Sequence, residues 1–200
     1  MQTRGRPRSF DRDVALEVAM RVFWEKGYEG TTIADLTGAM GLKPPSFYGA
    51  FGDKCTLFRE AVQRYADNDG AAPMRALRET PTLKGALQAM LHAAIGLYAQ
   101  PGRPSGCLVV TAAINCTPEH AGHMSELAER RMRMRTAIEA RIAQGQAAHE
   151  LPAHVDAAGL AEFFATVLQG LALRAKDGAS IEQLTGSVDL AMRALEPKAA

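Results

Sequence analysis

The sequence predicts an all-α protein in which a small N-terminal helical unit precedes a larger one, with about nine helices in all. Alanine, leucine, methionine and arginine, which are good helix formers, are abundant. The alternation of apolar and polar residues that is typical of strands is almost absent. Capping residues also stand ahead of apolar residues at helical spacing. These three observations favour helices throughout the chain.

Composition places the 200-residue chain among folded globular proteins, because 47% of its residues are hydrophobic and 22% are charged. The net charge of +1 removes a globally basic surface as an argument for nucleic-acid binding. No apolar run has the length of a membrane span, and the basic N-terminus leads into no apolar signal region. Cys55, Cys107 and Cys116 lack zinc-site spacing. We expect a cytoplasmic protein with reduced thiols, no metal, no cofactor and no membrane partner.

The first predicted helix begins after an N-cap at Asp11 and ends near Lys26, just before Gly27. Its apolar residues recur at helical spacing, which indicates one buried face. The predicted inward residues are Val14, Val18, Val22 and Phe23.

Two very short helices follow, separated by a glycine turn. Thr32 and Asp35 form a T-x-x-D capping box at the start of the second helix, and Gly41 supplies the positive φ of a sharp turn. The third helix can hold the prolines at 44–45 only in its first turn. The residues predicted to face inward from it are Phe47 and Phe51. This order is typical of a helix-turn-helix, which places a small helix in a DNA groove.

The larger unit contains predicted helices separated by clear breaks. Asp53 caps a fourth helix, and the segment 67–73 breaks or kinks the chain after it. Later helices are predicted at 83–99, 107–116, 119–149, 153–176 and 180–195. His120 and His123 at the start of one of them lack a third metal ligand, which favours a solvated helix terminus.

The stretch 27–54 resembles the TetR family of bacterial transcriptional repressors. The matching residues are Gly27, Tyr28, Thr31, Thr32, Ile33, Leu36, Gly41, Phe47, Tyr48, Phe51, Asp53 and Lys54. The resemblance implies a homodimer that binds double-stranded operator DNA, with one third helix in each of two major grooves. It also implies a DNA-binding domain at 1–53 and a ligand-binding and dimerisation domain at 54–200.

The same resemblance assigns DNA contacts. The implied phosphate contacts are Thr31, Thr32, Tyr48 and Lys54, which would fix register. Base readout falls to Lys43, Pro44, Pro45, Ser46 and Gly49, although the prolines and Gly49 depart from the common pattern and leave few side chains that hydrogen-bond bases. The basic residues of the N-terminal arm are Arg4, Arg6 and Arg8. This arm is suited to phosphates or a minor groove, and a plain solvated terminus is the alternative.

An effector site is expected in the larger unit. Its apolar helices suggest an apolar or amphipathic small molecule, and charge is not expected to select it. The sequence Ser-Gly-Cys-Leu around Cys107 is similar to that of the NemR-like electrophile-sensing branch of the family. A helix N-terminus there would favour a reactive thiolate, whereas burial as a small hydrophobe would raise the thiol pKa. The candidate effector residues are Cys107, Thr111 and Met134.

The last two helices carry enough apolar residues to pair with a second copy. The candidate interface residues are Phe163, Phe164, Val167, Leu171, Ile181, Leu184, Val188 and Met192. The alternative is that these side chains fill only their own core. For function, we expect a ligand-responsive DNA-binding repressor and no enzyme. A helical thiol-dependent enzyme and a DNA-binding protein without an effector are the alternatives, although no catalytic motif supports the enzyme.

Overall fold

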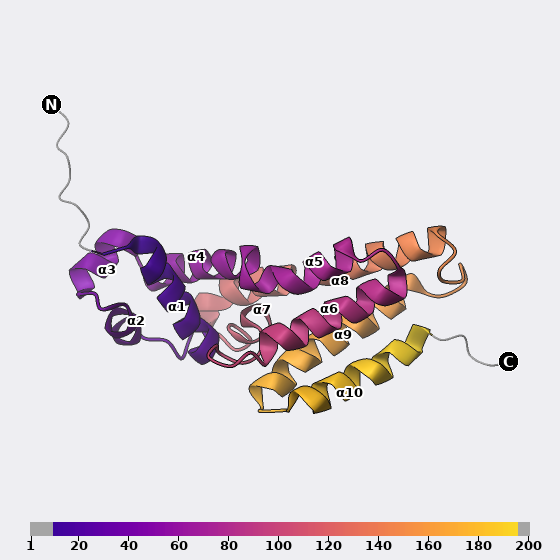
Figure 1. The fold of residues 1–200 in the computed structure, drawn as a ribbon. Helices are drawn as coiled ribbons and strands as arrows, with labels where there is room; N and C mark the ends of the chain where they lie inside the picture. Colours follow the sequence, from indigo (N-terminus) through magenta and orange to yellow (C-terminus); the bar gives the residue numbers. More distant parts are fainter. Residues whose placement is uncertain (1–9, 196–200) are drawn as a thin grey trace.

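The computed structural model describes residues 10–195, and these form ten α-helices, three short 3₁₀ turns and no strand. The first three helices lie at one end of an elongated molecule (Figure 1). The long helices of the larger unit run lengthwise away from them, and the last described residue, Leu195, lies toward the opposite end of the molecule. The predicted all-α class is confirmed.

The N-terminal helical unit, called the reader below because of its expected role, consists of α1 (Arg12–Lys26), α2 (Ile33–Met40) and α3 (Pro44–Phe51). The side chain of Asp11 caps α1, and Thr32 forms the predicted capping box with Asp35. Gly41 has a φ of 65°, the left-handed conformation that the turn between α2 and α3 requires. Local chemistry therefore fixes the helix-turn-helix as expected.

The buried face of α1 differs from the predicted one. Val14 is 61% exposed, and Val18 and Val22 are only partly buried. The buried residues of this helix are Ala15, Leu16, Ala19, Met20, Phe23 and Trp24. The prediction is confirmed for Phe23 and wrong for the valines. Because α1 packs against α2, α4 and α7 together, the side that carries Trp24 is covered and the valine stripe is not.

The remaining helices build the larger unit. They are α4 (Lys54–Asp67), α5 (Ala72–Glu79), α6 (Leu83–Tyr98), α7 (Leu108–Thr111), α8 (Ala121–Ala147), α9 (Ala157–Lys176) and α10 (Ile181–Met192). Two differ from the prediction. The chain resumes as α5 after one 3₁₀ turn at Asp69–Ala71, because proline is tolerated in a first turn. The expected helix 107–116 is only the four-residue α7, and the chain beyond it turns.

One hydrophobic core runs through both units. Phe23 and Tyr28 of the reader pack against Phe58 of α4, with ring centroids 5.1 and 5.0 Å apart. In the larger unit, α6 lies between α5, α9 and α10, and α8 packs along α9. The reader and the larger unit therefore share apolar contacts and are not joined by a free linker. Within residues 10–195, no helix has the length and apolar character needed to cross a membrane.

Candidate DNA-reading surface and effector cavity

The outer side of α3 is the exposed surface of the helix-turn-helix. Phe47 and Phe51 are buried and hold the helix on the reader, as predicted. The residues exposed around its start and outer side are Lys43, Pro44, Pro45, Ser46, Tyr48 and Gly49. Tyr48 is 51% exposed, and its ring packs edge-on against Phe47 with centroids 5.2 Å apart. The Tyr48 hydroxyl and the Lys43 ammonium are therefore both exposed on this surface.

Two of the expected phosphate contacts have internal roles. Thr31 is buried, with 1% of its surface exposed, and its hydroxyl donates to the Gly27 carbonyl at 2.6 Å. The Lys54 ammonium donates to the carbonyls of Tyr28 and Thr31 at 3.0 and 2.9 Å and lies over the Tyr28 ring. These residues brace the entry to α2. The family resemblance was misleading for Thr31, because its side chain is not accessible to DNA.

Thr32 remains on the surface, where its hydroxyl donates to a carboxylate oxygen of Asp35 at 2.7 Å. Lys26 also contacts Asp35 at 2.6 Å, and its hydrogen bond is the largest of the contacts that hold the pKa of this carboxyl well below its usual range. These contacts fix the start of α2, with Thr32 exposed at its N-cap. Arg4, Arg6 and Arg8 lie outside the described residues.

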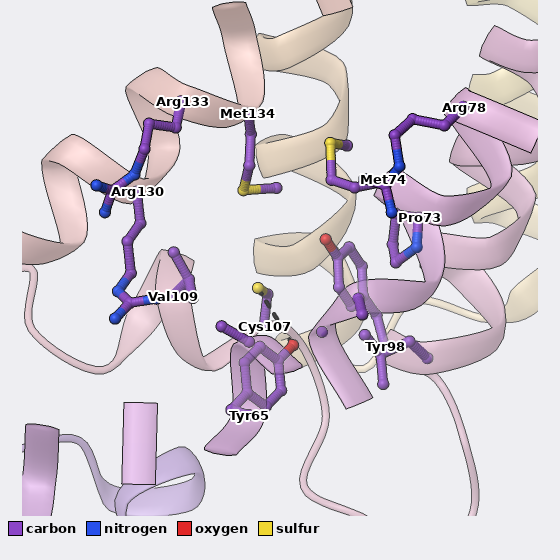
Figure 2. A pocket seen from close by; sticks show the side chains of 14 residues that line it. Tyr65, Pro73, Met74, Arg78, Tyr98, Cys107, Val109, Arg130, Arg133 and Met134 are labelled. Carbon is purple, nitrogen blue, oxygen red and sulfur yellow. Dashed lines mark hydrogen bonds between the residues drawn. The ribbon is translucent and has the colours of Figure 1, made fainter. Parts of the chain in front are cut away.

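A cavity of about 260 Å³ lies in the larger unit between α4, α5, α6, the α7 segment and α8 (Figure 2). Cys107 and Met134, both predicted as effector residues, line it. Thr111, the third, does not, because α7 turns its side chain back to donate to the Cys107 carbonyl at 3.0 Å. The full lining is Tyr65, Ala66, Gly70, Ala71, Pro73, Met74, Arg78, Leu97, Tyr98, Cys107, Val109, Arg130, Arg133 and Met134.

Cys107 is the buried N-cap residue of α7. The Tyr65 hydroxyl donates to its sulfur at 3.3 Å, as Figure 2 shows. Burial raises the pKa of the Cys107 thiol, and hydrogen bonds from Tyr65, from the backbone of Val110 and Val109 and from Tyr98 offset this only in part. Of the two alternatives for this thiol, burial prevails, because the backbone N–H groups at the start of the single-turn α7 offset the desolvation only in part.

Sequence reasoning missed most of this lining. Tyr65 and Tyr98 lie in apolar stripes at helical spacing, which indicates core, and Arg130 and Arg133 lie on a charged helix face. No pattern in the sequence singles out Arg78. Only the fold brings Arg78 on α5 opposite Arg130 and Arg133 on α8. Because Arg78 is distant in the sequence from Arg130 and Arg133, the sequence alone does not indicate that they line one cavity. Glu126 and Arg130, four residues apart on α8, form an ion pair at 3.4 Å.

The segment 106–117, called the junction segment below, connects the cavity with the reader. Its Gly106 carbonyl accepts a hydrogen bond from the Trp24 indole at 3.2 Å, and its Ala112 carbonyl accepts one from the Tyr28 backbone N–H at 2.7 Å. At its far end, Glu29 accepts from the Thr117 backbone N–H at 2.9 Å. Cys107 lies directly beside the first of these contacts. The cavity residue is thus the chain neighbour of a residue that is hydrogen-bonded to the last turn of α1.

His123 lies in the first turn of α8 and is buried, with 3% of its surface exposed. Its ring packs on Tyr28 and Phe58, with centroids 4.3 and 4.9 Å apart. The expectation of a solvated histidine pair was wrong for this residue, because α8 folds back over the reader core. His120 instead contacts Glu29 at 2.8 Å. Within residues 10–195, no group of three or more potential ligands is arranged for a metal ion.

We expect His123 to make the protein less stable as the pH falls below about 6.5, the pKa of an unperturbed histidine. Burial lowers the pKa of His123, with Arg59 and His120 acting in the same direction and Glu126 and Glu29 opposing. The unfolded chain therefore takes up this proton first, and the free energy of unfolding falls by at most about 1.4 kcal/mol per pH unit.

Urea unfolding at pH 7.5 and at pH 5.5 measures this loss. The variant His123→Leu carries the four other histidines, so the difference between the two pH dependences isolates His123. Equal pH dependences in the two proteins would contradict the assignment.

The exposed faces of α9 and α10 carry only some of the residues predicted for the dimer interface. Five of its eight candidates fill the core of their own chain: Phe164, Leu171, Leu184, Val188 and Met192. Phe163 and Ile181 are 41% and 57% exposed, and Val167 is partly buried. Leu190 is 63% exposed on the outer face of α10 and was missed. The helix period places the large inner stripe against α6, which leaves a smaller apolar face outside.

Comparisons with known proteins agree with this architecture. Residues 15–61 match the family model described as bacterial regulatory proteins, tetR family, and residues 84–194 match that described as tetracyclin repressor-like, C-terminal domain. The HTH-type transcriptional repressor ComR of Escherichia coli strain K12 is 35% identical over 184 residues, which cover 92% of this chain and 88% of ComR.

Solved structures show the same similarity. A cysteine mutant of the TetR family transcriptional regulator CifR, complexed with 26-bp double-strand operator DNA, is 41% identical with a TM-score of 0.92, covering 96% of this chain and all of that one. The reduced form of E. coli NemR has a TM-score of 0.74 at 18% identity, covers 94% of this chain and 98% of its own, and shows a shared fold alone. The chain belongs to the TetR family of transcriptional regulators.

Proposed function

We propose that this protein is a homodimeric repressor that binds operator DNA through α3 and leaves it when a small molecule occupies the cavity. The observation that carries the proposal is the junction segment, which contacts the cavity at Cys107 and the reader at Trp24 and Tyr28. The likeness to CifR, which is solved with operator DNA, supports the DNA-binding part. A regulator of this kind acts where the chromosome is, so a cytoplasmic location belongs to the proposal.

In the DNA complex, α3 enters the major groove and its neighbours hold the backbone. We assign Lys43 and Tyr48 to contacts with DNA, with Thr32 at the start of α2 as a further phosphate contact. Pro44, Pro45, Ser46 and Gly49 form the remaining surface, whose contacts to bases are mainly apolar. We propose the boundary between the DNA-binding domain, 1–53, and the effector domain, 54–200; the cap of α4 at Asp53 supports this choice.

The dimer forms through the outer faces of α9 and α10. Phe163, Ile181 and Leu190 are exposed there. Exposed apolar patches of this kind mark interaction sites, because burying them against a second copy removes apolar surface from water. Two readers tethered in this way bind two half-sites, and effective concentration strengthens the second contact. Light scattering at micromolar concentration tests the dimer, and a monomer would contradict this part of the proposal.

Cys107 is the candidate sensor for a thiol-reactive effector. Its buried position beside Tyr65 and next to the junction segment means that an added group must displace neighbouring atoms. The thiol reacts through the small thiolate fraction that its raised pKa leaves, so we expect a slow and selective response.

Selection of genomic fragments by the purified protein tests the proposed function. The expected product is a near-palindromic site whose half-sites are spaced for two readers, confirmed by footprinting. N-ethylmaleimide should release that site from the unmodified protein and leave it bound by Cys107→Ser. Failure to select any site would contradict the function, whereas release of the Cys107→Ser protein would contradict the sensor alone.

Trp24→Phe is expected to weaken the response to N-ethylmaleimide without abolishing DNA binding. The change removes the hydrogen bond to Gly106 and keeps most of the aromatic packing on Tyr65. Leaving the buried Gly106 carbonyl without its donor costs about 1–3 kcal/mol of stability. We expect operator affinity within a few-fold of wild type and at most half of the release at saturating reagent, measured by fluorescence anisotropy.

Leu184→Ala is the matched control, because it also destabilises the protein but lies on α10, away from the junction segment. If both variants lose the same part of the response, the loss follows from stability and the Trp24 contact has no coupling role.

A further inference from the structure

We propose that the cavity recognises an anionic group, so that the effector is an amphipathic small molecule with a negatively charged head. The inference rests on the proposed function, since it concerns the ligand of the same cavity. It also corrects the expectation that charge does not select the ligand.

The charge of the lining is one-sided. Arg78, Arg130 and Arg133 are among its fourteen residues, and no aspartate or glutamate is. The whole chain has 23 basic and 22 acidic residues, so this imbalance is local. A concave site with one sign of charge and apolar walls concentrates ligands of the opposite sign. The cavity lining is therefore locally positive, although the net charge of the whole protein is only +1.

The three guanidiniums come from opposite sides of the cavity. Figure 2 shows Arg130 and Arg133 on α8 and Arg78 across from them on α5. Arg78 and Arg133 are exposed, and within residues 10–195 neither has a carboxylate within salt-bridge distance. A head group between the two helices would meet donors from both, and the planar fork of arginine fits carboxylate and phosphate oxygens.

Arg130 is only partly satisfied. One terminal nitrogen donates to the Gln63 amide oxygen at 2.9 Å and to Glu126 at 3.4 Å. Its Nε is buried and has no partner among the described residues. Buried N–H groups without an acceptor are costly, so an acceptor at this wall would be strongly favoured. An anionic oxygen supplies that acceptor.

Apolar atoms complete the lining. Met74, Met134 and Leu97 form walls, and methionine side chains adapt to ligands of varied shape. The floor holds Cys107 with the Tyr65 hydroxyl at 3.3 Å. A ligand with a charged head and a short apolar body satisfies both parts, whereas a wholly apolar ligand offers no acceptor to Arg78, Arg133 or the Arg130 Nε.

Alkylation with a matched reagent pair tests the charge at Cys107. Iodoacetate and iodoacetamide have nearly the same shape and differ in charge. With either reagent, the thiol loses its proton to solvent, a sulfur–carbon bond forms, and iodide leaves with the electrons of the carbon–iodine bond. We expect the iodoacetate-to-iodoacetamide rate ratio at Cys107 to exceed that at Cys55 and Cys116 by about tenfold. Peptide mass spectrometry measures all three in one sample.

Variants identify the cause. In Arg78→Gln/Arg133→Gln the ratio at Cys107 should fall toward that of the other cysteines, because both side chains are exposed and their loss leaves the fold intact. Arg75→Gln is the control, since Arg75 is exposed on the same helix as Arg78 but does not line the cavity. A ratio at Cys107 no higher than at the other cysteines, or one that the double variant does not change, would overturn the proposal.

Reversible binding gives a second measurement that holds even if Cys107 resists alkylation. Calorimetry compares hexanoate and hexyl phosphate with hexanol and hexylamine. At least one anion should bind about tenfold more tightly than the alcohol, by about 1.4 kcal/mol, and the amine should bind least. The anion that binds more tightly identifies the head group. Equal affinities for anions and alcohol would overturn the inference, while genomic site selection would still decide the proposed function separately.

Discussion

Replacing both Lys43 and Tyr48 with alanine should lower the operator affinity of the dimer by roughly a thousandfold. Each contact to the DNA backbone or to a base is worth about 1 kcal/mol, and a dimer loses four of them, which gives about 4 kcal/mol. Both side chains are exposed around α3, so the fold should remain intact. Fluorescence anisotropy on the selected operator measures the change.

The salt dependence separates the lysine from the tyrosine. Lys43→Ala alone removes one cation per protomer, so the slope of log affinity against log salt should become shallower by about 2. Tyr48→Phe removes only a hydroxyl and should leave the slope unchanged. Lys84→Ala, an exposed lysine on α6 remote from the reader, is the control for net charge. Equal losses in Lys43→Ala and Lys84→Ala would contradict the assigned surface.

Gly106→Ala should destabilise the protein by about 3 kcal/mol. Gly106 has a φ of 82°, which costs an alanine about 1–2 kcal/mol, and an added Cβ would lie 2.8 Å from the Ala172 carbonyl oxygen. That oxygen belongs to α9, so the overlap cannot be relieved by a side-chain rotation. The expected fall in Tm is about 6–12 °C, measured by thermal denaturation.

Gly102→Ala is the control on the same loop. Gly102 has a similar φ of 78°, but nothing lies within 4 Å of its would-be Cβ. It should therefore show the cost of strain alone, about 1–2 kcal/mol. If the two variants lose equal stability, the close approach of Gly106 to the Ala172 carbonyl of α9 has no energetic consequence, which would contradict the structure.

Local chemistry accounts for what could be predicted from the sequence. The capping box at Thr32, the turn at Gly41 and the cap at Asp53 depend on neighbours within a few residues, and all three are present. Leu57, Phe58 and Tyr65 recur at helical spacing in the sequence, and all three lie on the buried face of α4. Such features are fixed by the chain before any long-range packing.

Features that depend on distant partners could not be predicted. The buried side of α1 is set by what packs around it, and Lys54 bonds carbonyls that lie 26 and 23 residues away. The pKa of Cys107 follows from burial among helices far away in the sequence, which outweighs the local dipole. The arginines of the cavity meet only because α5 and α8 face each other. Residue type suggested each role, and tertiary contacts decided it.

The ring contacts of His123 bear on how this protein can be engineered. Tyr28 belongs to the reader, Phe58 to α4 and His123 to α8, yet their rings form one cluster. The helix-turn-helix therefore cannot be exchanged as an independent unit, because its packing depends on side chains of α4 and α8. A chimaera that grafts a relative's first 53 residues onto this chain would place foreign side chains against Phe58 and His123. Successful grafts should need the matching positions of α4 and α8 transferred together with the reader.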